Sequence, residues 1–311
     1  MPLSLRRGQV SAIHERHEGL VRLEVDGVAC VAYPKLTGPV ALDDEVLVNV
    51  QARELELGSG GFDVLYANLT RGLELAPEDG AHVMVLPYTP LQHARLHVEE
   101  RGESEAALDG MPVVCCSLHS QVAPVCAALQ GVRVAYVQLA GGALPVSLSD
   151  TVRALKERRL LAASAAVSPC FDADVQCASV ASALAWAHAS CEVVVCAIGP
   201  GIVGTGTRLG HGGLAVAEAA NVTHALGGRA VVAVRASGAD ERKRHRGISH
   251  HTESVLALVH GDVIVPEQDG SGWREASGGL PLSHMGRGPE EDPEFFAAAH
   301  GAGLAARELV R

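Results

Sequence analysis

Short apolar runs with a two-residue period fill the first third of the chain. They are "GQVSAIHER", "GLVRLEVDGVACVAYP", "DEVLVNVQARELEL" and "HVMVLPYT", each rich in β-branched residues and bounded by Gly, Asp or Pro. These segments predict a small N-terminal β domain that closes as a barrel or a sandwich. The polar stretch "EERGESEAALDG" follows. We therefore place the domain boundary there, with a β-rich domain over residues 1–105 and a second domain over residues 106–311.

From Pro112 onward, apolar runs alternate with segments of helical period. The predicted strands lie near "PVVCC", "VRVAYVQL", "LAASAAVS", "EVVVCAI", "RAVVAVRA" and "DVIVP". Helices are predicted between them, and a C-terminal helix begins at Pro293 with Asp292 as its cap. Strands that are apolar on both faces are typical of a parallel sheet with helices on both sides. The sequence therefore predicts an α/β fold, with a doubly wound, mostly parallel, Rossmann-like sheet after the small β domain.

Composition and net charge argue against some classes of binding partner. Of the 311 residues, 48% are hydrophobic, which is enough for a sizeable core, and the formal net charge of -11 opposes binding to nucleic acid or to an anionic membrane. The chain has no apolar run of about 18 residues and no signal-peptide pattern near its start. Its eight cysteines contain no CxxC pair, which is typical of buried thiols in a reducing compartment. We expect a cytoplasmic protein with neither a nucleic-acid nor a membrane partner.

Polar or glycine-rich segments follow five of the predicted strands. In an open parallel sheet, ligands bind where the chain leaves the carboxyl end of a strand and enters a helix. Numbered along the chain, the five junctions are "SLHSQ", "AGGALPVSLSD", "SPCFDADVQ", "GPGIVGTGTRLGHGG" and "SGADERKRHRGISHHT". We expect them to lie together at one edge of the sheet.

The fourth junction carries a signal for an anion. Its glycines expose backbone amides ahead of a helix, an arrangement that suits phosphate or carboxylate. The predicted anion ligands are Gly199, Gly201, Gly204, Thr205, Gly206 and Thr207. The same segment spells GxGxxG, but Pro200 stands at the second position and the loop continues instead of entering a helix. A dinucleotide site and a purely structural glycine loop are the alternatives.

The fifth junction adds positive charge. Its predicted ligand-binding residues are Asp240, Arg242, Arg246 and Ser249. A guanidinium is suited to carboxylate or phosphate, and Ser249 is placed to cap the following helix. A solvated charged loop is the alternative.

Three histidines at the junctions are candidates for acid–base catalysis: His119, His250 and His251. His250 and His251 are adjacent, so on a helix they diverge by about 100° and do not readily converge on one ion. The sequence therefore assigns no metal. A metal at this pair would need ligands from elsewhere, such as His119, Asp172, Asp174 or Asp240.

These motifs resemble a known family. The segments "PVVCCSLHSQVAPV", "GGALPVSLSDTVRALKE", "GPGIVGTGTRLGHGG" and "ADERKRHRGISHHT", with the N-terminal "YPKLTGPVALDDEVLVNV" and "LELGSGGFDVLYANL", are similar to bacterial proteins catalogued as a domain of unknown function, in the thirty-eight hundreds of that catalogue. The resemblance covers nearly the whole chain and implies no activity or catalytic residue. This chain departs at "QLAGGALP", where an acidic residue is expected before the glycines.

The predicted function is the binding of a small anionic, in particular phosphorylated, metabolite at the carboxyl ends of the parallel strands. His119, His250 or His251 would transfer protons if the protein is an enzyme. One alternative is a non-catalytic ligand sensor or assembly factor whose β domain contacts a protein partner. Another is an NADP-dependent oxidoreductase with Arg235 near the 2′-phosphate. The sequence specifies neither a cofactor nor the oligomeric state. It is compatible with a homo-oligomer.

Overall fold

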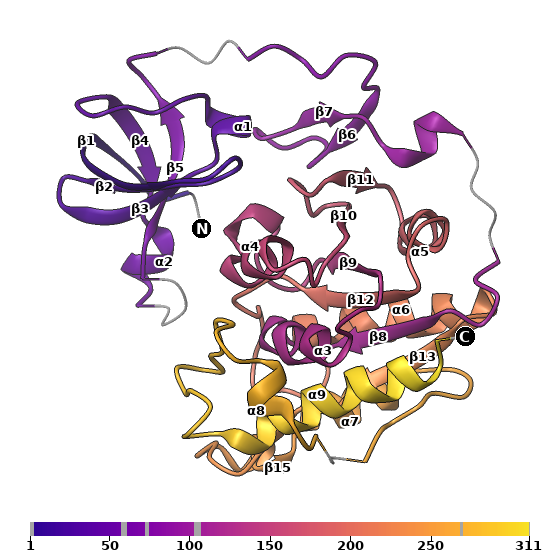
Figure 1. Cartoon of the computed structure of the whole chain (residues 1–311). Helices are drawn as coiled ribbons and strands as arrows, with labels where there is room; N and C mark the ends of the chain where they lie inside the picture. The colour runs from indigo at the N-terminus through magenta and orange to yellow at the C-terminus, as the bar shows by residue number, and fades with distance from the viewer. Residues whose placement is uncertain (1–2, 57–60, 72–74, 103–106, 268–269, 311) are drawn as a thin grey trace. The chain divides into compact units, whose positions relative to one another are not determined.

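The computed structural model describes residues 3–56, 61–71, 75–102, 107–267 and 270–310. The chain divides into two compact units, Met1–Arg95 and Leu96–Arg311, and Figure 1 shows the elements of each. The boundary predicted between residues 105 and 106 falls within segment 103–106, which lies outside the described residues.

The first unit contains a closed barrel with strand order β1-β2-β3-β5-β4. The strands are β1 (Leu5–Arg16), β2 (Val21–Val25), β3 (Val28–Ala32), β4 (Glu45–Asn49) and β5 (Asp63–Asn68). Only β3 and β5 pair in parallel. Burial alternates along β2, so Val21, Leu23 and Val25 lie in the barrel core. The two-residue period of the sequence therefore predicted this barrel correctly.

The segment after β4 differs from the predicted strand. "QARE" forms the short helix α2 (Gln51–Glu54) instead of continuing β4, because these polar residues have no apolar face to bury in the barrel. The helix α1 (Pro34–Thr37) and a two-stranded hairpin, β6 (Val83–Val85) with β7 (His93–Arg95), also belong to this unit.

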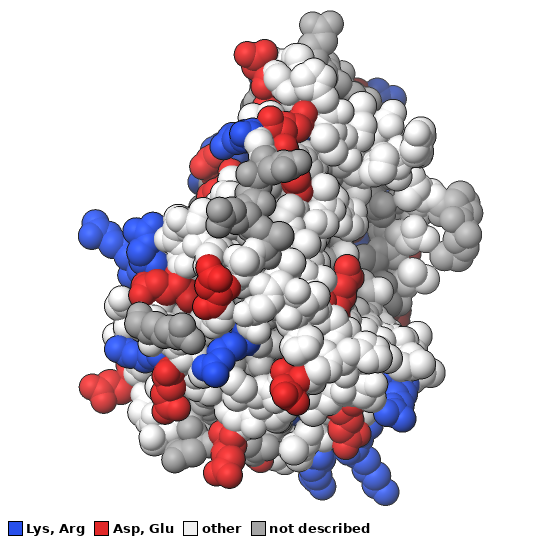
Figure 2. Space-filling model, turned by 90° about the vertical axis from the view of Figure 1, so that its right-hand side faces the viewer, with Lys and Arg blue, Asp and Glu red and all other residues white. Residues whose placement is uncertain are grey.

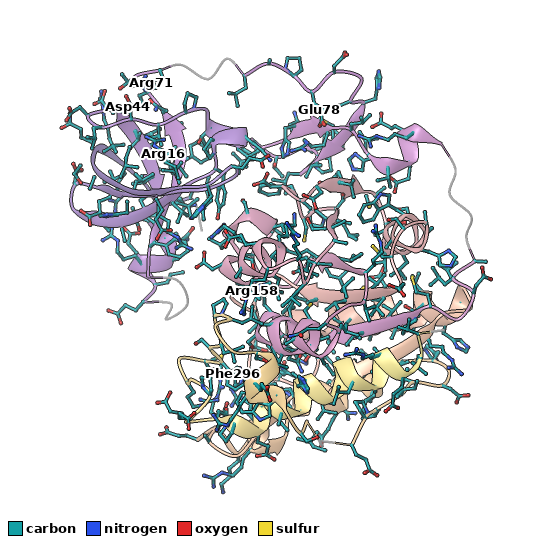
Figure 3. All side chains as sticks on the ribbon, viewed as in Figure 1. Arg16, Asp44, Arg71, Glu78, Arg158 and Phe296 are labelled. Atoms are coloured by element: carbon teal, nitrogen blue, oxygen red, sulfur yellow. The ribbon has the colours of Figure 1, made fainter. Side chains whose placement is uncertain are left out.

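A buried carboxylate ties two strand ends of the barrel together. Asp44 precedes β4, and its Oδ2 accepts hydrogen bonds from Arg71 Nε at 2.6 Å and Asn68 Nδ2 at 2.8 Å. Asp44 and Arg71 lie beside each other in Figure 3. Because Asn68 ends β5, these bonds join the start of one strand to the end of its neighbour.

The second unit is built on a sheet with strand order β11-β10-β9-β12-β8-β13, in which neighbouring strands run parallel. The strands are β8 (Pro112–Cys116), β9 (Val134–Leu139), β10 (Ala163–Val167), β11 (Val175–Cys177), β12 (Val193–Ile198) and β13 (Arg229–Ala233). Every residue of β8, β9 and β12 is buried, as expected for central parallel strands covered on both faces.

Helices cover both faces of this sheet (Figure 1). One face carries α3 (Val122–Ala128), α4 (Asp150–Glu157) and α9 (Pro293–Glu308), and the other carries α5 (Val180–His188), α6 (Ala215–Ala225) and α7 (His250–Leu256). Along β8, Val114 and Cys116 face the first group, whereas Val113 and Cys115 face the second. This arrangement confirms the predicted doubly wound α/β fold. All eight cysteines are free and buried.

Two segments near the sheet edges differ from the predicted strands. "DVIVP" forms only an isolated parallel bridge between Ile264 and Val231, because Pro266 cannot donate to a strand ladder. β11, in contrast, was not predicted. It has three residues and lies in the polar segment "DADVQC", which is too short and too polar to show a strand pattern.

The last helix begins where the sequence places it, but its cap differs. Asp292 is the residue before Pro293, yet its carboxylate makes no cap hydrogen bond. It accepts from Ser237 Oγ at 2.7 Å and from Arg287 Nε at 3.0 Å instead, since a charged donor binds a buried carboxylate more strongly than a backbone amide does. Further along α9, Phe296 stacks on Trp273 of α8 (Trp273–Ala276), with ring centroids 5.7 Å apart.

Charged side chains of both signs are interspersed on the face shown in Figure 2, with wide uncharged areas between them. Within the part of the chain that the structure describes, every helix is too short or too polar to cross a lipid bilayer.

Candidate functional site

The carboxyl ends of β8 and β12 are adjacent, and the chain leaves them in opposite directions. β8 leads through α3 to β9, which lies beyond β12, whereas β12 leads through α6 to β13, which lies beyond β8. α3 and α6 cover opposite faces of the sheet. Such a reversal is a topological switch point, the position where open α/β sheets bind ligands. The first and fourth junctions leave the sheet at this point.

Contacts between neighbouring segments join all five junctions at this edge. The second junction meets the third through a bridge between Pro145 and Phe171. In the first junction, Gln121 Nε2 donates to the carbonyl oxygen of Ala233 at 3.0 Å, at the end of β13, the strand that leads into the fifth junction. The remaining contacts are described below. The expectation that the five junctions lie together is confirmed.

His119 links the first junction to the end of β12 and to the second junction. Its Nδ1 lies 3.2 Å from the carbonyl oxygen of Ile198, and its Nε2 lies 2.6 Å from Oγ of Ser149. Nδ1 therefore donates to the carbonyl oxygen, and the Ser149 hydroxyl donates to Nε2. Burial lowers the pKa of His119 to about 4, so the ring is neutral at pH 7. In this arrangement both ring nitrogens are occupied, and the ring holds β8, β12 and α4 together.

Glycines allow the second and fourth junctions to pack backbone against backbone. A Cβ atom on Gly212 would lie 1.9 Å from the carbonyl oxygen of Gly141, and one on Gly199 would lie 2.0 Å from that of Ala143. The amide of Ala143 also donates to the carbonyl oxygen of Pro200 at 2.8 Å. Any larger residue at Gly199 or Gly212 would collide with the opposite chain. Packing alone therefore accounts for these two glycines, including the predicted anion ligand Gly199.

The rest of the fourth junction is a small hairpin over residues 203–212. Gly204 bridges His211, and the amide of Thr205 donates to the carbonyl oxygen of Gly210 at 2.6 Å. The hydroxyls of Thr205 and Thr207 lie 2.8 Å apart. Both threonines, predicted to contact an anion, thus bond within the hairpin. Because a hairpin follows the GxGxxG segment where a dinucleotide site needs a helix, this loop lacks the geometry of that fingerprint.

The hairpin lies next to the fifth junction through Arg244. A Cβ atom on Gly206 would be 3.6 Å from the guanidinium carbon of Arg244. Arg244 is exposed, and its side chain forms no hydrogen bond or ion pair with the described residues. Arg242, a predicted anion ligand, instead makes two hydrogen bonds with Asp240, at 2.9 and 2.7 Å. Arg246 is exposed, and its role as a ligand stays a prediction.

Arg235 is a buried guanidinium at the centre of the fifth junction, with 2% of its surface exposed. Its Nη1 lies 2.9 Å from Nδ1 of His251, and its Nη2 lies 3.6 Å from Asp240 Oδ2. Its Nε has no hydrogen-bond partner among the described residues. Burial, with a contribution from nearby Arg242, lowers the pKa of Arg235 to about 10. The side chain therefore stays charged at pH 7 with one donor unused.

Asp240 is shared by three guanidiniums. Arg242 and Arg287 approach its Oδ2 at 2.7 and 3.4 Å, in addition to Arg235. Burial would raise the pKa of Asp240, but hydrogen bonds from Arg242 outweigh that effect and hold the pKa well below its usual range. Arg287 also pairs with Asp292. Three guanidiniums thus face two carboxylates, which leaves the cluster with net positive charge.

Four histidines lie beside these arginines: His211, His245, His250 and His251. Stacked rings of His211 and His251 have centroids 3.8 Å apart, and those of His250 and His251 are 4.5 Å apart. The expectation that His250 and His251 diverge is therefore wrong. Both lie in the first turn of α7, after its cap Ser249, and their long side chains lean toward His211 and His245.

The four histidines are neutral at pH 7. Burial is the largest cause in each case, and Arg235 adds to it, lowering the pKa of His245 to about 3 and that of His251 to about 2. Burial also lowers the pKa of His211 and of His250. Both ring nitrogens of His211 and Nε2 of His250 are buried without a partner in the described structure. One nitrogen each from His211, His250 and His251 lies within 4.8 Å of the others.

The third junction has no comparable cluster in the described residues. Asp174 accepts hydrogen bonds from Lys156 Nζ at 2.7 and 2.8 Å and from the amide of Ser164 at 2.8 Å. Asp172 has a positive φ of 66°, a left-handed backbone conformation that Asp tolerates better than most residues do. In the first junction, Ser117 is buried and its hydroxyl has no hydrogen-bond partner among the described residues.

Residues 29–276 match the family model described as "Protein of unknown function (DUF3866)". The chain belongs to this family. No curated protein matches it. The DUF3866 match runs from β3 to α8 and contains all five junctions, whereas Arg287 and Asp292 lie beyond it.

Within this DUF3866 chain, the site contains residues that the sequence did not single out. His211, His245 and Arg287 are among them. His211 stands in "LGHGG" at the end of the fourth junction. A histidine between glycines after an apolar strand is a local signal that could have identified it. The predicted residues His250, His251, Asp240 and Arg242 are brought together, whereas His119 lies in a separate hydrogen-bonded group.

Proposed function

We propose that the second unit binds a small anionic ligand, through a phosphate or carboxylate group, between Arg235 and Arg244. The observation that carries the proposal is the Nε–H of Arg235, which is buried and has no acceptor in the described structure. An unsatisfied buried donor costs about 1–3 kcal/mol, and more when it is charged. An anion that accepts this hydrogen bond would remove that cost.

The surrounding charge supports an anion rather than a neutral ligand. Among the described residues, Arg235, Arg242 and Arg287 all pair with Asp240, and Arg287 also pairs with Asp292. Arg244 adds a further positive charge, close enough to lower the pKa of both Arg235 and His250. Charge-assisted hydrogen bonds between guanidinium and phosphate or carboxylate are about twice as strong as neutral ones.

A neutral histidine completes the set of donors. His211 carries one N–H group when neutral, and both of its ring nitrogens are buried without a hydrogen-bond partner among the described residues. This group donates a hydrogen bond to an anion without adding charge. An enzyme and a ligand sensor would both need this binding step, and the proposal covers that step.

Isothermal titration calorimetry with orthophosphate and with a dicarboxylate, each in the presence of a chelator, tests the proposal. We expect one site per chain and a rise of the unfolding midpoint with ligand concentration. Arg244→Ala should weaken binding about tenfold or more, because a charge-assisted hydrogen bond is worth about 1.5–3 kcal/mol. Arg244 is exposed, so this variant should fold normally.

Lys243→Ala is the matched control. Lys243 is also exposed and carries the same charge one residue away, so a general loss of positive charge would affect both variants equally. Equal weakening in the two variants, or no heat of binding with either anion, would contradict the proposal.

A further inference from the structure

We propose that His211, His250 and His251 bind a transition-metal ion of the zinc class. One nitrogen from each ring lies within 4.8 Å of the other two. The residues come from two separate segments, the end of the hairpin over residues 203–212 and the first turn of α7. This site is a different claim from the anion proposal and does not depend on it.

The state of the rings suits a metal. A ligating histidine must be neutral, with a free lone pair. Nδ1 and Nε2 of His211 and Nε2 of His250 are buried and have no hydrogen-bond partner in the described residues. Each unpartnered nitrogen costs free energy in a buried site. A metal ion on His211 and on His250 would satisfy one nitrogen of each ring.

The donor type selects the kind of ion. Imidazole nitrogen suits zinc, copper, nickel and cobalt, whereas magnesium and calcium prefer oxygen. The three residues that converge are all histidines, with no carboxylate among them. Three protein ligands leave a fourth position open, as in catalytic zinc sites.

Binding requires small movements of the rings. At a Zn–N distance of about 2.0–2.1 Å, nitrogens in a tetrahedral site are about 3.4 Å apart, so rings up to 4.8 Å apart must close by rotation of their side chains. The rings of His211 and His251 are stacked within 14° of parallel. One of them must therefore turn so that both lone pairs point at the ion.

Arg235 sets the condition for the third ligand. Its Nη1 donates to Nδ1 of His251, so the neutral ring carries its proton on Nε2. Ligation through Nδ1 replaces that hydrogen bond, and ligation through Nε2 requires the ring proton to move to Nδ1, which also breaks the bond from Arg235. His251 is therefore the last ligand to engage.

The positive charge of Arg235 favours an anion at the fourth coordination position. Arg235 repels a divalent ion, and an anion bound there would offset the charge of the metal ion and that of the guanidinium. We therefore expect the metal to bind more tightly when phosphate is present. That linkage is additional, because the three histidines by themselves supply the metal ligands.

Metal competition experiments on the full chain test the site. The protein is stripped with a chelator and dialysed, and Zn²⁺ is then titrated against a chromophoric chelator. Co²⁺ is titrated separately while its d–d absorption is recorded. We expect one equivalent of ion per chain and an absorption spectrum typical of nitrogen ligands in a four-coordinate site. A wild-type chain that binds less than one equivalent of either ion overturns the proposal without any variant.

Variants identify the ligands. His211→Gln and His250→Ala should each weaken Zn²⁺ binding by at least about a hundredfold, since even the outer hydrogen-bond partners of metal ligands contribute about 10- to 100-fold. His260→Ala is the matched control, because His260 is an exposed histidine four residues after the end of α7. Circular dichroism of each variant reports its folding. Binding that is unchanged in His250→Ala, or equally weakened in His260→Ala, would place the ion elsewhere.

The two proposals fail separately. Loss of phosphate binding with intact Zn²⁺ binding removes the anion site alone. If the chain binds phosphate in the presence of chelator but does not bind Zn²⁺ when the chelator is absent, the metal proposal alone is contradicted.

Discussion

The hydroxyl of Ser149 lies 2.6 Å from Nε2 of His119 and also accepts the amide hydrogen of Val152 at 2.9 Å. One side chain thus caps α4 and fixes the histidine that joins β8 to β12. Ser149 is 3% exposed, so water cannot replace either bond. The second junction is held against the switch point by this hydroxyl.

Ser149→Ala should destabilise the fold by more than the loss of a cap. Loss of a cap costs about 1 kcal/mol, and a buried His119 nitrogen without a donor adds about 1–3 kcal/mol. Ser179→Ala is the control, because Ser179 caps α5 but is exposed. Urea denaturation of the two variants measures the difference. Equal losses of unfolding free energy would show that the His119 bond contributes nothing.

Gly212→Ala should lower the unfolding free energy by about 1–3 kcal/mol or more, as overpacking does in a rigid site. The new Cβ would lie 1.9 Å from the carbonyl oxygen of Gly141, so two backbone segments must separate. Gly206→Ala, whose Cβ would meet only the Arg244 side chain at 3.6 Å, should be nearly neutral. Thermal and urea denaturation of both variants check this, and a neutral Gly212→Ala would contradict the close packing of the two junctions.

Asp240→Asn should be strongly destabilising. The change removes the carboxylate that pairs with Arg235 and Arg242, while Arg287 keeps its pair with Asp292. Breaking a buried ion pair costs about 3–5 kcal/mol. Glu290→Gln breaks an ion pair with Arg274 in which both side chains are exposed, and it should cost less than about 1 kcal/mol. Chemical denaturation compares the two. Equal effects would mean that Asp240 is better solvated than its 2% exposure indicates.

Stability should fall as the pH is lowered from about 6.5 toward 5. Burial lowers the pKa of His119 to about 4, and burial together with Arg235 lowers that of His284 to about 3, from an ordinary value of 6.5. In this range the unfolded chain binds protons that the folded chain does not. Protonation therefore favours unfolding, and the full stability is present above about pH 6.5.

Each such histidine contributes up to about 1.4 kcal/mol per pH unit. Urea titrations at several pH values above about 5, where few carboxylates titrate, measure the slope. His119→Gln should give a shallower slope than the wild type, because one of the proton-binding groups is removed. Identical slopes would show that His119 does not contribute.

Local patterns in the sequence predicted most of the elements and the class of fold. Alternation over "GLVRLEVDGVACVAYP" predicted barrel strands, and fully apolar runs such as "EVVVCAI" predicted central parallel strands, because burial on one or both faces leaves a direct record in the residue period. "QARE" and "DVIVP" were misassigned. The polar residues of "QARE" end strand β4, and Pro266 limits "DVIVP" to an isolated bridge. The hydrophobic pattern around each segment still resembles that of a strand.

The candidate site was predicted only in part, for a physical reason. The sequence by itself determined which segments follow the strands, so it pointed to His119, Asp240, Arg242 and the pair His250–His251. The tertiary structure alone decided which of them meet, because the order of strands places β12 beside β8 and no local period encodes that order. This neighbourhood locks His119 onto Ile198 and Ser149. Packing of the fourth and fifth junctions brings His211 to the histidine pair across about forty residues of chain and sets a buried arginine, Arg235, beside them.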